Sequence, residues 1–256
     1  MAQGNAVTAV EFMHQLGLHA LAVQETRLRS DDDRPSDLHR SYHFVGRARP
    51  PNLESCSNNR GGGVGWIIHK SLGTVTVLSD KGGVENGCER IWIRLLTNAG
   101  PIFLASVYWR PGEQITIESL IDEVIELSGI GDVIVAGDFN AELPLTMASL
   151  SSPSSSMSLS SEDDYDDDDD DGDDRGGKKK KKEMKKKTKA TTKPKQRLAS
   201  HSALLSSFLA QTSLHPASDP SIPTHRLNPN TNPKAIDHFF ISEGLRGRTC
   251  YSGPSP

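Results

Sequence analysis

The sequence predicts an α/β sandwich, a fold in which helices pack against β-sheets. Short apolar runs typical of buried strands recur along the chain, and three segments show apolar residues at helical spacing. Turn-forming residues separate the expected strands. Of the 256 residues, 35% are hydrophobic, which is enough for one sizeable core. We therefore expect one domain rather than two.

The first part of the chain predicts a helix, a strand and a loop. Apolar residues at roughly helical spacing predict a helix over 6–16, with Gly17 suited to cap its C-terminal end. The apolar run over 19–24 predicts a buried strand that stops at Glu25. Charged residues, prolines and asparagines dominate from 29 to 60, which predicts a long surface loop.

The remaining elements alternate between strands and helices. A glycine run at 61–63 opens the first of several paired strands, and Asn98-Ala99-Gly100 has the composition of a hairpin turn. Further strands are expected over 64–69, 74–78, 90–96, 102–108, 133–136 and 235–242. Further helices are expected over 115–127 and 199–212.

A low-complexity insert separates two parts of the expected domain. A serine tract, an acidic run over 166–171 and a lysine run over 178–187 follow one another without an apolar pattern. Such a segment buries too little apolar surface to offset its ordering entropy, so we expect disorder. The expected division is 1–148 and 197–248 for the domain, 149–196 for the insert and 249–256 for an irregular tail. The lysines are read as a solvated loop or, alternatively, as a nuclear-import or nucleic-acid contact.

Charge and cysteine content narrow the class of protein. A formal net charge of −4 argues against a generally basic nucleic-acid-coating protein, although this sum does not reveal a local basic groove. Cys56, Cys88 and Cys250 are odd in number and far apart, which fits neither a disulfide framework nor a zinc knuckle. With no apolar stretch of membrane-spanning length and no secretory signal, we expect an intracellular protein, and the lysine run favours the nucleus.

The segment around Asp138 has the clearest chemical potential. A buried strand leads into Gly137, then Asp138 and Asn140 lie two residues apart, a spacing at which an extended chain points both side chains the same way. A carboxylate and an amide in one pocket can orient water and hold a phosphate oxygen or a hard metal ion. The alternative is a polar turn at the strand end, closed by a contact between the Asp138 side chain and the backbone.

Three other strand ends offer polar side chains. Glu25 stands where an apolar strand stops, and Asp237 begins the last expected strand. Tyr108 ends another strand, so its hydroxyl and the guanidinium of Arg110 can meet a phosphate. The alternatives are a solvated glutamate, a packed tyrosine and a surface arginine. Four strand ends with polar groups suggest a shared site.

These segments, in this order, resemble the endonuclease/exonuclease/phosphatase superfamily. The matching phrases are Leu-Ala-Val-Gln-Glu-Thr-Arg-Leu, Gly-Gly-Gly-Val-Gly-Trp-Ile-Ile, Val-Tyr-Trp-Arg-Pro, Val-Ala-Gly-Asp-Phe-Asn-Ala and Ile-Asp-His-Phe-Phe-Ile-Ser. The superfamily includes apurinic endonucleases, pancreatic-type deoxyribonucleases, retrotransposon endonucleases and inositol-polyphosphate 5-phosphatases. The resemblance covers about 6–242 apart from the insert, and it implies an incomplete four-layered α/β sandwich of the deoxyribonuclease-like type.

The resemblance also implies a role for each candidate residue. Glu25 would bind Mg²⁺, with Mn²⁺ as an alternative, and Asp138 would position or activate the attacking water. Asn140 would hold the scissile phosphate and Tyr108 would contact it. Asp237 would orient a catalytic histidine further along the chain.

The sequence departs from the family pattern at both ends. It reaches Pro256 without the expected Ser-Asp-His segment, and it begins at the helix without the preceding strand that carries an asparagine. We therefore expect both ends to lack family elements. His238 follows Asp237 on an extended strand and should face the opposite side, so we expect it to be structural. Trp66 and Trp109 are expected to pack in the core rather than to stack on a base.

Three functions stay open on the sequence alone. The phrases Tyr-Trp-Arg-Pro and Ile-Asp-His-Phe-Phe resemble retrotransposon-type endonucleases, which favours a metal-dependent hydrolase of nucleic acid. The second reading is a catalytically inactive remnant that binds nucleic acid. The third is a phosphoinositide-type phosphatase, for which basic residues should line the pocket.

Overall fold

The computed structural model describes residues 5–33, 35, 38–50, 62–143, 200–217 and 236–246. The helices are α1 (Asn5–Gln15), α2 (Glu118–Ser128) and α4 (His201–Gln211), with 3₁₀ turns at Lys70–Leu72 and Glu243–Leu245. The strands are β1 (Ala20–Gln24), β2 (Tyr42–Arg47), β3 (Val64–His69), β4 (Val75–Val77), β5 (Gly83–Glu85), β6 (Cys88–Thr97), β7 (Gly100–Trp109), β8 (Asp132–Asp138), β9 (Leu214–Pro216) and β10 (Asp237–Ser242).

The strands form two sheets. The smaller one has the order β1-β3-β2 and is antiparallel throughout. The larger one has the order β4-β6-β7-β8-β10-β9, and β5 also pairs with β6. Only the β7–β8 pair is parallel among the described strands. A parallel pair needs a crossover between its strands, and α2 supplies it.

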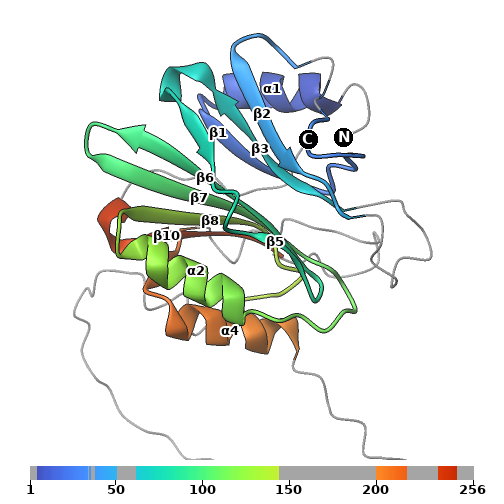
Figure 1. Cartoon of the computed structure of the whole chain (residues 1–256), viewed down its shortest axis with the longest axis vertical. Coiled ribbons are helices and arrows are strands. Elements are labelled where there is room, and N and C mark those ends of the chain that lie inside the picture. The colour runs from blue at the N-terminus through green and yellow to red at the C-terminus, as the bar shows by residue number, and fades with distance from the viewer. Residues whose placement is uncertain are drawn as a thin grey trace, which may run out of the picture. The chain divides into compact units, whose positions relative to one another are not determined.

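The two sheets face each other and carry helices on their outer faces (Figure 1). Helix α1 packs on the smaller sheet, where Val10 and Met13 join Phe44 and Ile67 in one apolar cluster. Helices α2 and α4 cover the outer face of the larger sheet. A third cluster lies between the sheets and includes Trp66. This helix–sheet–sheet–helix order confirms the four-layered α/β sandwich that the sequence predicted.

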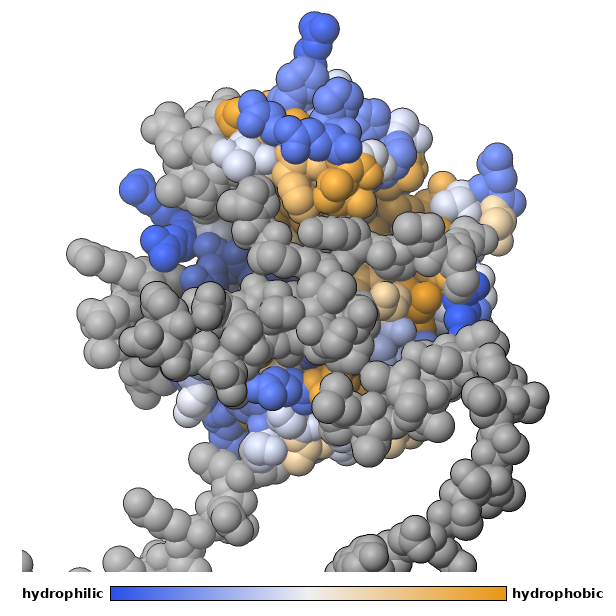
Figure 2. Space-filling view, turned by 180° about the vertical axis from the view of Figure 1, so that it is seen from behind, coloured by the Kyte–Doolittle hydropathy of each residue, from blue (hydrophilic) through white to orange (hydrophobic). Residues whose placement is uncertain are grey.

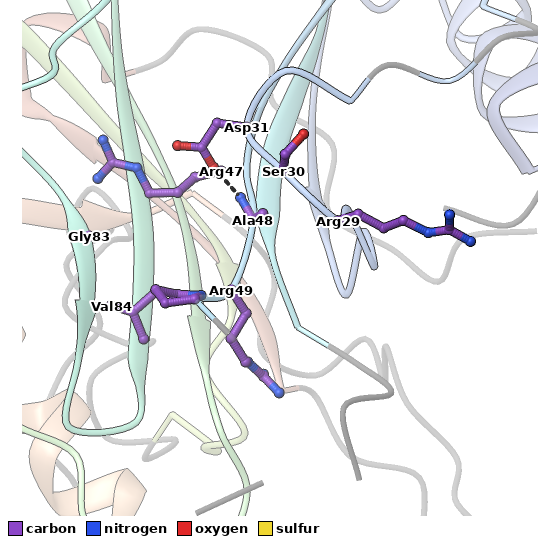
Figure 3. Close-up of a pocket in the computed structure, with 9 residues that line it drawn as sticks. Arg29, Ser30, Asp31, Arg47, Ala48, Arg49, Gly83 and Val84 are labelled. Atoms are coloured by element: carbon purple, nitrogen blue, oxygen red, sulfur yellow. Dashed lines mark hydrogen bonds between the residues drawn. The ribbon is translucent and has the colours of Figure 1, made fainter. Parts of the chain in front are cut away.

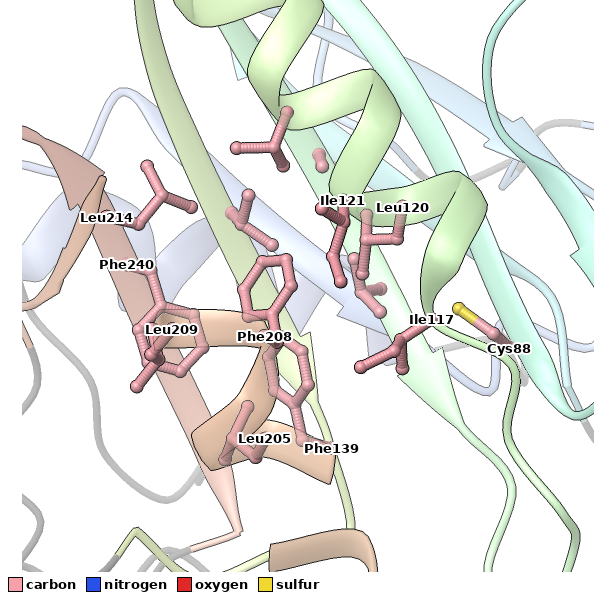
Figure 4. Packing of buried hydrophobic residues seen from close by; sticks show 14 of the residues in the cluster. Cys88, Ile117, Leu120, Ile121, Phe139, Leu205, Phe208, Leu209, Leu214 and Phe240 are labelled. Atoms are coloured by element: carbon pink, nitrogen blue, oxygen red, sulfur yellow. The ribbon is translucent and has the colours of Figure 1, made fainter. Parts of the chain in front are cut away.

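The largest apolar cluster joins α2 and α4 to the larger sheet (Figure 4). Leu120 and Ile121 of α2 lie on the buried face that the helical spacing predicted. Phe208 of α4 packs edge-on against Phe240 of β10, with ring centroids 6.0 Å apart. Phe139 contacts the same ring at 5.3 Å. Each such side chain stabilises the fold by about 1.5–3 kcal/mol when fully buried. This cluster therefore holds α2 and α4 against the larger sheet.

Gly137 lies where β8 approaches β7 most closely. A Cβ atom at Gly137 would lie 1.9 Å from the Val107 carbonyl oxygen, which is backbone and cannot rotate away. We expect Gly137→Ala to lower the free energy of unfolding by about 1–3 kcal/mol, the usual cost of overpacking. Urea denaturation measures this change.

Gly129→Ala is the matched control for Gly137→Ala. Gly129 has an ordinary helical φ of −73°, and a Cβ there would meet its nearest neighbour at 3.4 Å. Its stability should therefore stay close to that of the wild type. Equal stability of the two variants would show that β8 can move away from β7 without cost.

Three strands differ from what the sequence predicted. Strand β2 lies inside the expected loop over 29–60, because Tyr42 and Phe44 alternate with polar residues and bury one face. Strands β5 and β9 were not expected, since three residues are too few to show a period. Helix α2 begins at Glu118 rather than at 115, because Ile115 and Ile117 reach the core from the segment before the helix.

The residues on both sides of the insert belong to one sheet. Strand β8 precedes the insert, β10 follows it, and the two strands pair along five residues. The insert at 149–196 and the tail at 249–256 lie outside the described residues. The division of the chain at these boundaries therefore remains a prediction.

The exposed surface of the described residues is mixed in character. Large exposed apolar side chains are scattered over separate elements: Val7, Leu16, Val77, Leu96, Ile125 and Ile130. Hydrophobic side chains gather in patches between hydrophilic ones where described residues are visible on the face opposite to that of Figure 1 (Figure 2). No helix among the described residues combines the length and the apolar character that a bilayer crossing needs.

Candidate active site

Four side chains from neighbouring strands form a row across the larger sheet, here called the polar row. Glu89 of β6 is the register partner of Tyr108 of β7, and Tyr108 is the partner of Asp138 of β8. Asp138 is in turn the partner of Asp237 of β10. Register partners share a face of the sheet, and Tyr108 belongs to the cluster between the two sheets. The polar row therefore faces the smaller sheet.

Glu25 joins this row from the end of β1 in the smaller sheet. The Tyr108 hydroxyl donates a hydrogen bond to Glu25 Oε1 at 2.7 Å. Glu25 has a φ of 50°, a left-handed conformation that is uncommon for residues other than glycine. Such strain persists where the surroundings fix it, as at functional sites. The hydrogen bond from Thr26 N–H to the Gly63 carbonyl, at 3.2 Å, holds the backbone just beyond Glu25.

Further hydrogen bonds tie the two sheets together beside this contact. Gln24 Nε2 donates to Ser106 Oγ at 3.1 Å, and the Ser106 hydroxyl donates to the Val23 carbonyl at 3.3 Å. Ser106 is fully buried, so these bonds compensate its desolvation. The end of β1, and with it Glu25, is thereby positioned against β7.

The predicted geometry of Asp138 and Asn140 is wrong in one respect. The chain does not continue extended after β8, because Asn140 has a φ of 46°. The Asn140 N–H donates to Asp138 Oδ1 at 2.9 Å, which is the strand-end turn considered as the alternative. Asn140 Nδ2 donates to the Trp109 carbonyl at 2.8 Å. This amide nitrogen carries a second hydrogen, so Asn140 retains a donor for a ligand.

The electrostatic environment of the row raises the pKa of two of its members. Burial raises the pKa of Asp138 to about 7; the Asn140 N–H opposes this shift, while the negative charges of Asp237 and Glu25 add to it. Burial also raises the pKa of Tyr108, together with its hydrogen bond to Glu25 and the charge of that carboxylate. Tyr108 therefore stays protonated at neutral pH and acts as a hydrogen-bond donor. Asp138 is poised to bind or release a proton near neutral pH.

The raised pKa of Asp138 predicts that the metal-free protein loses stability as pH rises. The folded state binds this proton more tightly than the unfolded state, so the free energy of unfolding falls between about pH 4 and pH 7. Asp138→Asn removes this ionisation. The wild type should lose on the order of 3 kcal/mol of unfolding free energy between pH 5 and pH 8, and the variant should not show this loss. Urea denaturation in EDTA at pH 5 and pH 8 measures it. An identical pH dependence in wild type and variant would contradict the assignment.

A buried carboxylate that the sequence analysis missed completes the row. Glu89 is fully buried and accepts a hydrogen bond from Gly63 N–H at 2.6 Å. Its other oxygen accepts from Arg49 Nε at 2.6 Å. The positive charge of Arg49 opposes the rise in the pKa of Tyr108, and the bond to Glu89, the register partner of Tyr108, holds this guanidinium beside the row. The available signal was weak: Glu89 stands next to Arg90 just before the apolar run of β6, and buried charges need specific partners.

The edge of the sheets at which Glu25 meets the polar row is here called the rim. The sequence predicted Arg110 at this edge, but the structure does not place it there. Its side chain is buried, Nη1 donates to Glu113 Oε1 at 2.9 Å, and Nε lies 3.7 Å from Glu89. Arg110 follows the end of β7 at Trp109, and its guanidinium turns into the interior rather than to the surface. Arg49 supplies the guanidinium that lies near Tyr108 instead. The phosphate-binding role expected for Arg110 is therefore not carried further.

The histidine and tryptophans with expected packing roles are buried. His238 is the register partner of Gly137, and its Nε2 donates to the Ala141 carbonyl at 2.7 Å. Burial lowers the pKa of His238, so it stays neutral in the folded protein. Trp66 and Trp109 are at most 2% exposed. These positions are structural, as the sequence predicted.

The carboxylate oxygens at the rim suit a hard divalent cation that takes few of its ligands from protein. Among the described residues, no three His, Cys, Asp or Glu side chains lie close enough together to form a metal site of their own. Mg²⁺, however, is usually held by one or two carboxylates together with water and substrate phosphates. The negative charges that raise the pKa of Asp138 are the kind of group that such a cation neutralises. Glu25, exposed at the rim, is the accessible carboxylate.

The model of the Endonuclease/Exonuclease/phosphatase family matches residues 3–256, and the chain belongs to this family. No curated protein matches this sequence. The match to the family model confirms the family that the sequence predicted.

Solved structures agree with this fold. The endonuclease domain of TRAS1, a telomere-specific non-LTR retrotransposon, has a TM-score of 0.54 and 14% identity, over 96% of this chain and 82% of that chain. An endonuclease/exonuclease/phosphatase family protein from Leptotrichia buccalis has a TM-score of 0.50 and 10% identity, over 94% and 84% of the two chains. At these identities the likeness concerns the fold alone.

Proposed function

We propose that this chain hydrolyses phosphodiester bonds in nucleic acid with the help of a divalent cation. The observation that carries the proposal is the convergence of Glu25 from one sheet with Tyr108, Asp138 and Asp237 from the other. Carboxylates and a neutral phenol at one rim suit a reaction in which water attacks a phosphate. Arg49, anchored by Glu89, adds a positive charge beside Tyr108.

Each side chain has a proposed task. Glu25 would hold Mg²⁺, or Mn²⁺, which when bound neutralises charge on the phosphate oxygens. Asp138, with its pKa of about 7, accepts a proton from the attacking water. When a cation engages Glu25, the Tyr108 hydroxyl turns its one hydrogen from that carboxylate to a phosphate oxygen, and the remaining amide hydrogen of Asn140 donates to the phosphate as well. The family resemblance implies that Asp237 would orient a histidine of a Ser-Asp-His segment. This sequence contains no such segment, so a water molecule beside Asp237 would protonate the leaving oxygen.

Nucleic acid is the favoured substrate over a phosphoinositide. The sequence phrase Tyr-Trp-Arg-Pro resembles retrotransposon-type endonucleases, and the TRAS1 domain with the same fold is an endonuclease. The lysine run over 178–187 is the basis for proposing a nuclear location. It lies outside the described residues.

Cleavage of supercoiled plasmid DNA tests the proposal. The purified chain should convert supercoiled plasmid to nicked circles in Mg²⁺ or Mn²⁺ and should be inactive in EDTA. Release of phosphate from an inositol polyphosphate, with DNA left intact, would establish the phosphatase reading instead. DNA binding without cleavage in either metal would establish the inactive remnant.

A further inference from the structure

A cavity of about 430 Å³ lies beside the candidate active site and is rich in arginine (Figure 3). The residues before β2, the end of β2 and β5 line it, and they include Arg29, Arg47 and Arg49. Its volume falls in the range of about 300–1,000 Å³ that is typical of ligand sites. We call it the arginine cavity.

The charge of the arginine cavity favours an anion. Its lining residues include three arginines and one carboxylate, that of Asp31, and Arg49 is already paired with Glu89. One oxygen of Asp31 already accepts the Ala48 N–H at 2.6 Å. Arg47 Nη1 donates a hydrogen bond to the Lys81 carbonyl at 3.2 Å. This acceptor is neutral, so the bond positions the guanidinium without neutralising its charge. Guanidiniums bind phosphate oxygens with good geometry, so a phosphate is the anion that fits best.

Arg49 connects the arginine cavity to the polar row. Its guanidinium lines the cavity and also binds Glu89, which is the register partner of Tyr108. Arg49 therefore stands between the cavity and the strand beside the tyrosine that would contact the scissile phosphate. A ligand that occupies both places has phosphates spaced along its length.

The directions of the arginines indicate an extended ligand. Arg29 and Arg47 extend to opposite sides of the cavity, and Arg49 points away from both (Figure 3). A compact polyphosphate such as an inositol headgroup needs cations that converge on one point. Diverging cations instead suit a polyanion that passes across the surface, as a nucleic-acid strand does.

We propose that the arginine cavity binds a phosphodiester of the substrate strand next to the one that is cleaved. This inference rests on the proposed function, because it assigns a second contact of the same nucleic-acid substrate. The contact is to the backbone, so it adds affinity and positions the strand without reading its sequence.

Binding of a short fluorescein-labelled DNA duplex, followed by anisotropy in EDTA, tests the cavity without turnover. Arg29→Gln and Arg47→Gln should each weaken binding by about tenfold, the effect expected for removing a charge-assisted hydrogen bond to phosphate. The slope of log affinity against log salt should become shallower by about 0.9 for each phosphate that is no longer neutralised. Arg49 is left unchanged, because its pairing with Glu89 also supports the fold.

Arg246→Gln is the matched control. Arg246 is an exposed arginine beyond the far end of β10 and pairs with Glu243. Its removal should leave both affinity and salt slope unchanged. Melting temperatures of all three variants verify that they fold.

The outcomes separate this inference from the proposed function. Unchanged affinity and salt slope in Arg29→Gln and Arg47→Gln overturn the arginine cavity, even if the chain nicks DNA. A wild type that does not bind DNA overturns it as well. Inositol hexakisphosphate gives a third test: if either substitution abolishes the binding of this compound but leaves DNA binding intact, the cavity binds a compact polyphosphate and the inference is overturned. Weakened binding in both variants supports the cavity, even if plasmid cleavage fails and the catalytic proposal falls.

Discussion

Asp138→Asn should slow phosphodiester hydrolysis by about 10²–10⁴-fold, the usual contribution of a general base. The substitution keeps the shape of the side chain and removes its ability to accept a proton from water. Asp138→Ala should have at least the same effect, because it also removes the acceptor for the Asn140 N–H. Single-turnover cleavage of a labelled oligonucleotide in saturating Mg²⁺ measures the chemical step.

Asp122→Asn is the control for removal of a carboxylate. Asp122 is exposed on α2, in the outer helical layer, and its substitution should leave the cleavage rate unchanged. An Asp138→Asn rate above about a tenth of the wild-type rate would remove Asp138 from the proton transfer. Equal nicking by the wild type and Asp138→Ala would instead identify a contaminating nuclease.

Glu89→Gln should lower the free energy of unfolding by about 3–5 kcal/mol, as expected when one partner of a buried ion pair is removed. Glu89 is fully buried, while the Arg49 side chain is 15% exposed and the Arg110 side chain 6%. The amide would leave two poorly solvated guanidiniums beside a neutral group. Natural domains are stable by only about 5–15 kcal/mol, so a loss of this size is readily visible in urea denaturation.

Glu126→Gln tests whether this cost comes from burial. Glu126 pairs with Lys81 at the surface, where its side chain is 56% exposed. Water and salt screen such a pair, so its removal should not measurably change stability. Similar destabilisation in both variants would show that Glu89 contributes as an ordinary surface charge does.

Much of the fold could be predicted because its strands are buried and locally regular. Strand β3 is buried along five of its six residues and matches the predicted range 64–69. Turn residues marked the β6–β7 hairpin, whose paired ends are Thr97 and Gly100. Short apolar runs and turn chemistry are properties of neighbouring residues, so the sequence displays them directly.

The candidate residues were predictable, but their relation to one another was not. Glu25, Tyr108, Asp138 and Asp237 were recognised as polar groups at strand ends, and the structure brings them to one rim. The roles assigned to them stay predictions. Strand order and register decide which ends meet, and these depend on pairing between distant segments.

The errors have the same origin. Arg110 was expected to meet a phosphate beside the Tyr108 hydroxyl, but its side chain is buried and bonded to Glu113. Arg49 lay inside a segment that read as a surface loop, so its pairing with Glu89 was not foreseen. Such pairings, forty residues apart, have no local signature.

Glu25 follows a strand of the smaller sheet and Tyr108 lies in the larger one, so the proposed catalytic alignment would depend on how one sheet slides over the other. Trp66 is 2% exposed in the packing between the sheets, so we expect it to resist such displacement. Interiors are close-packed and transmit strain, so a void at Trp66 shifts the rim above it. Weakened packing there would first appear as reduced turnover in a protein that is still folded.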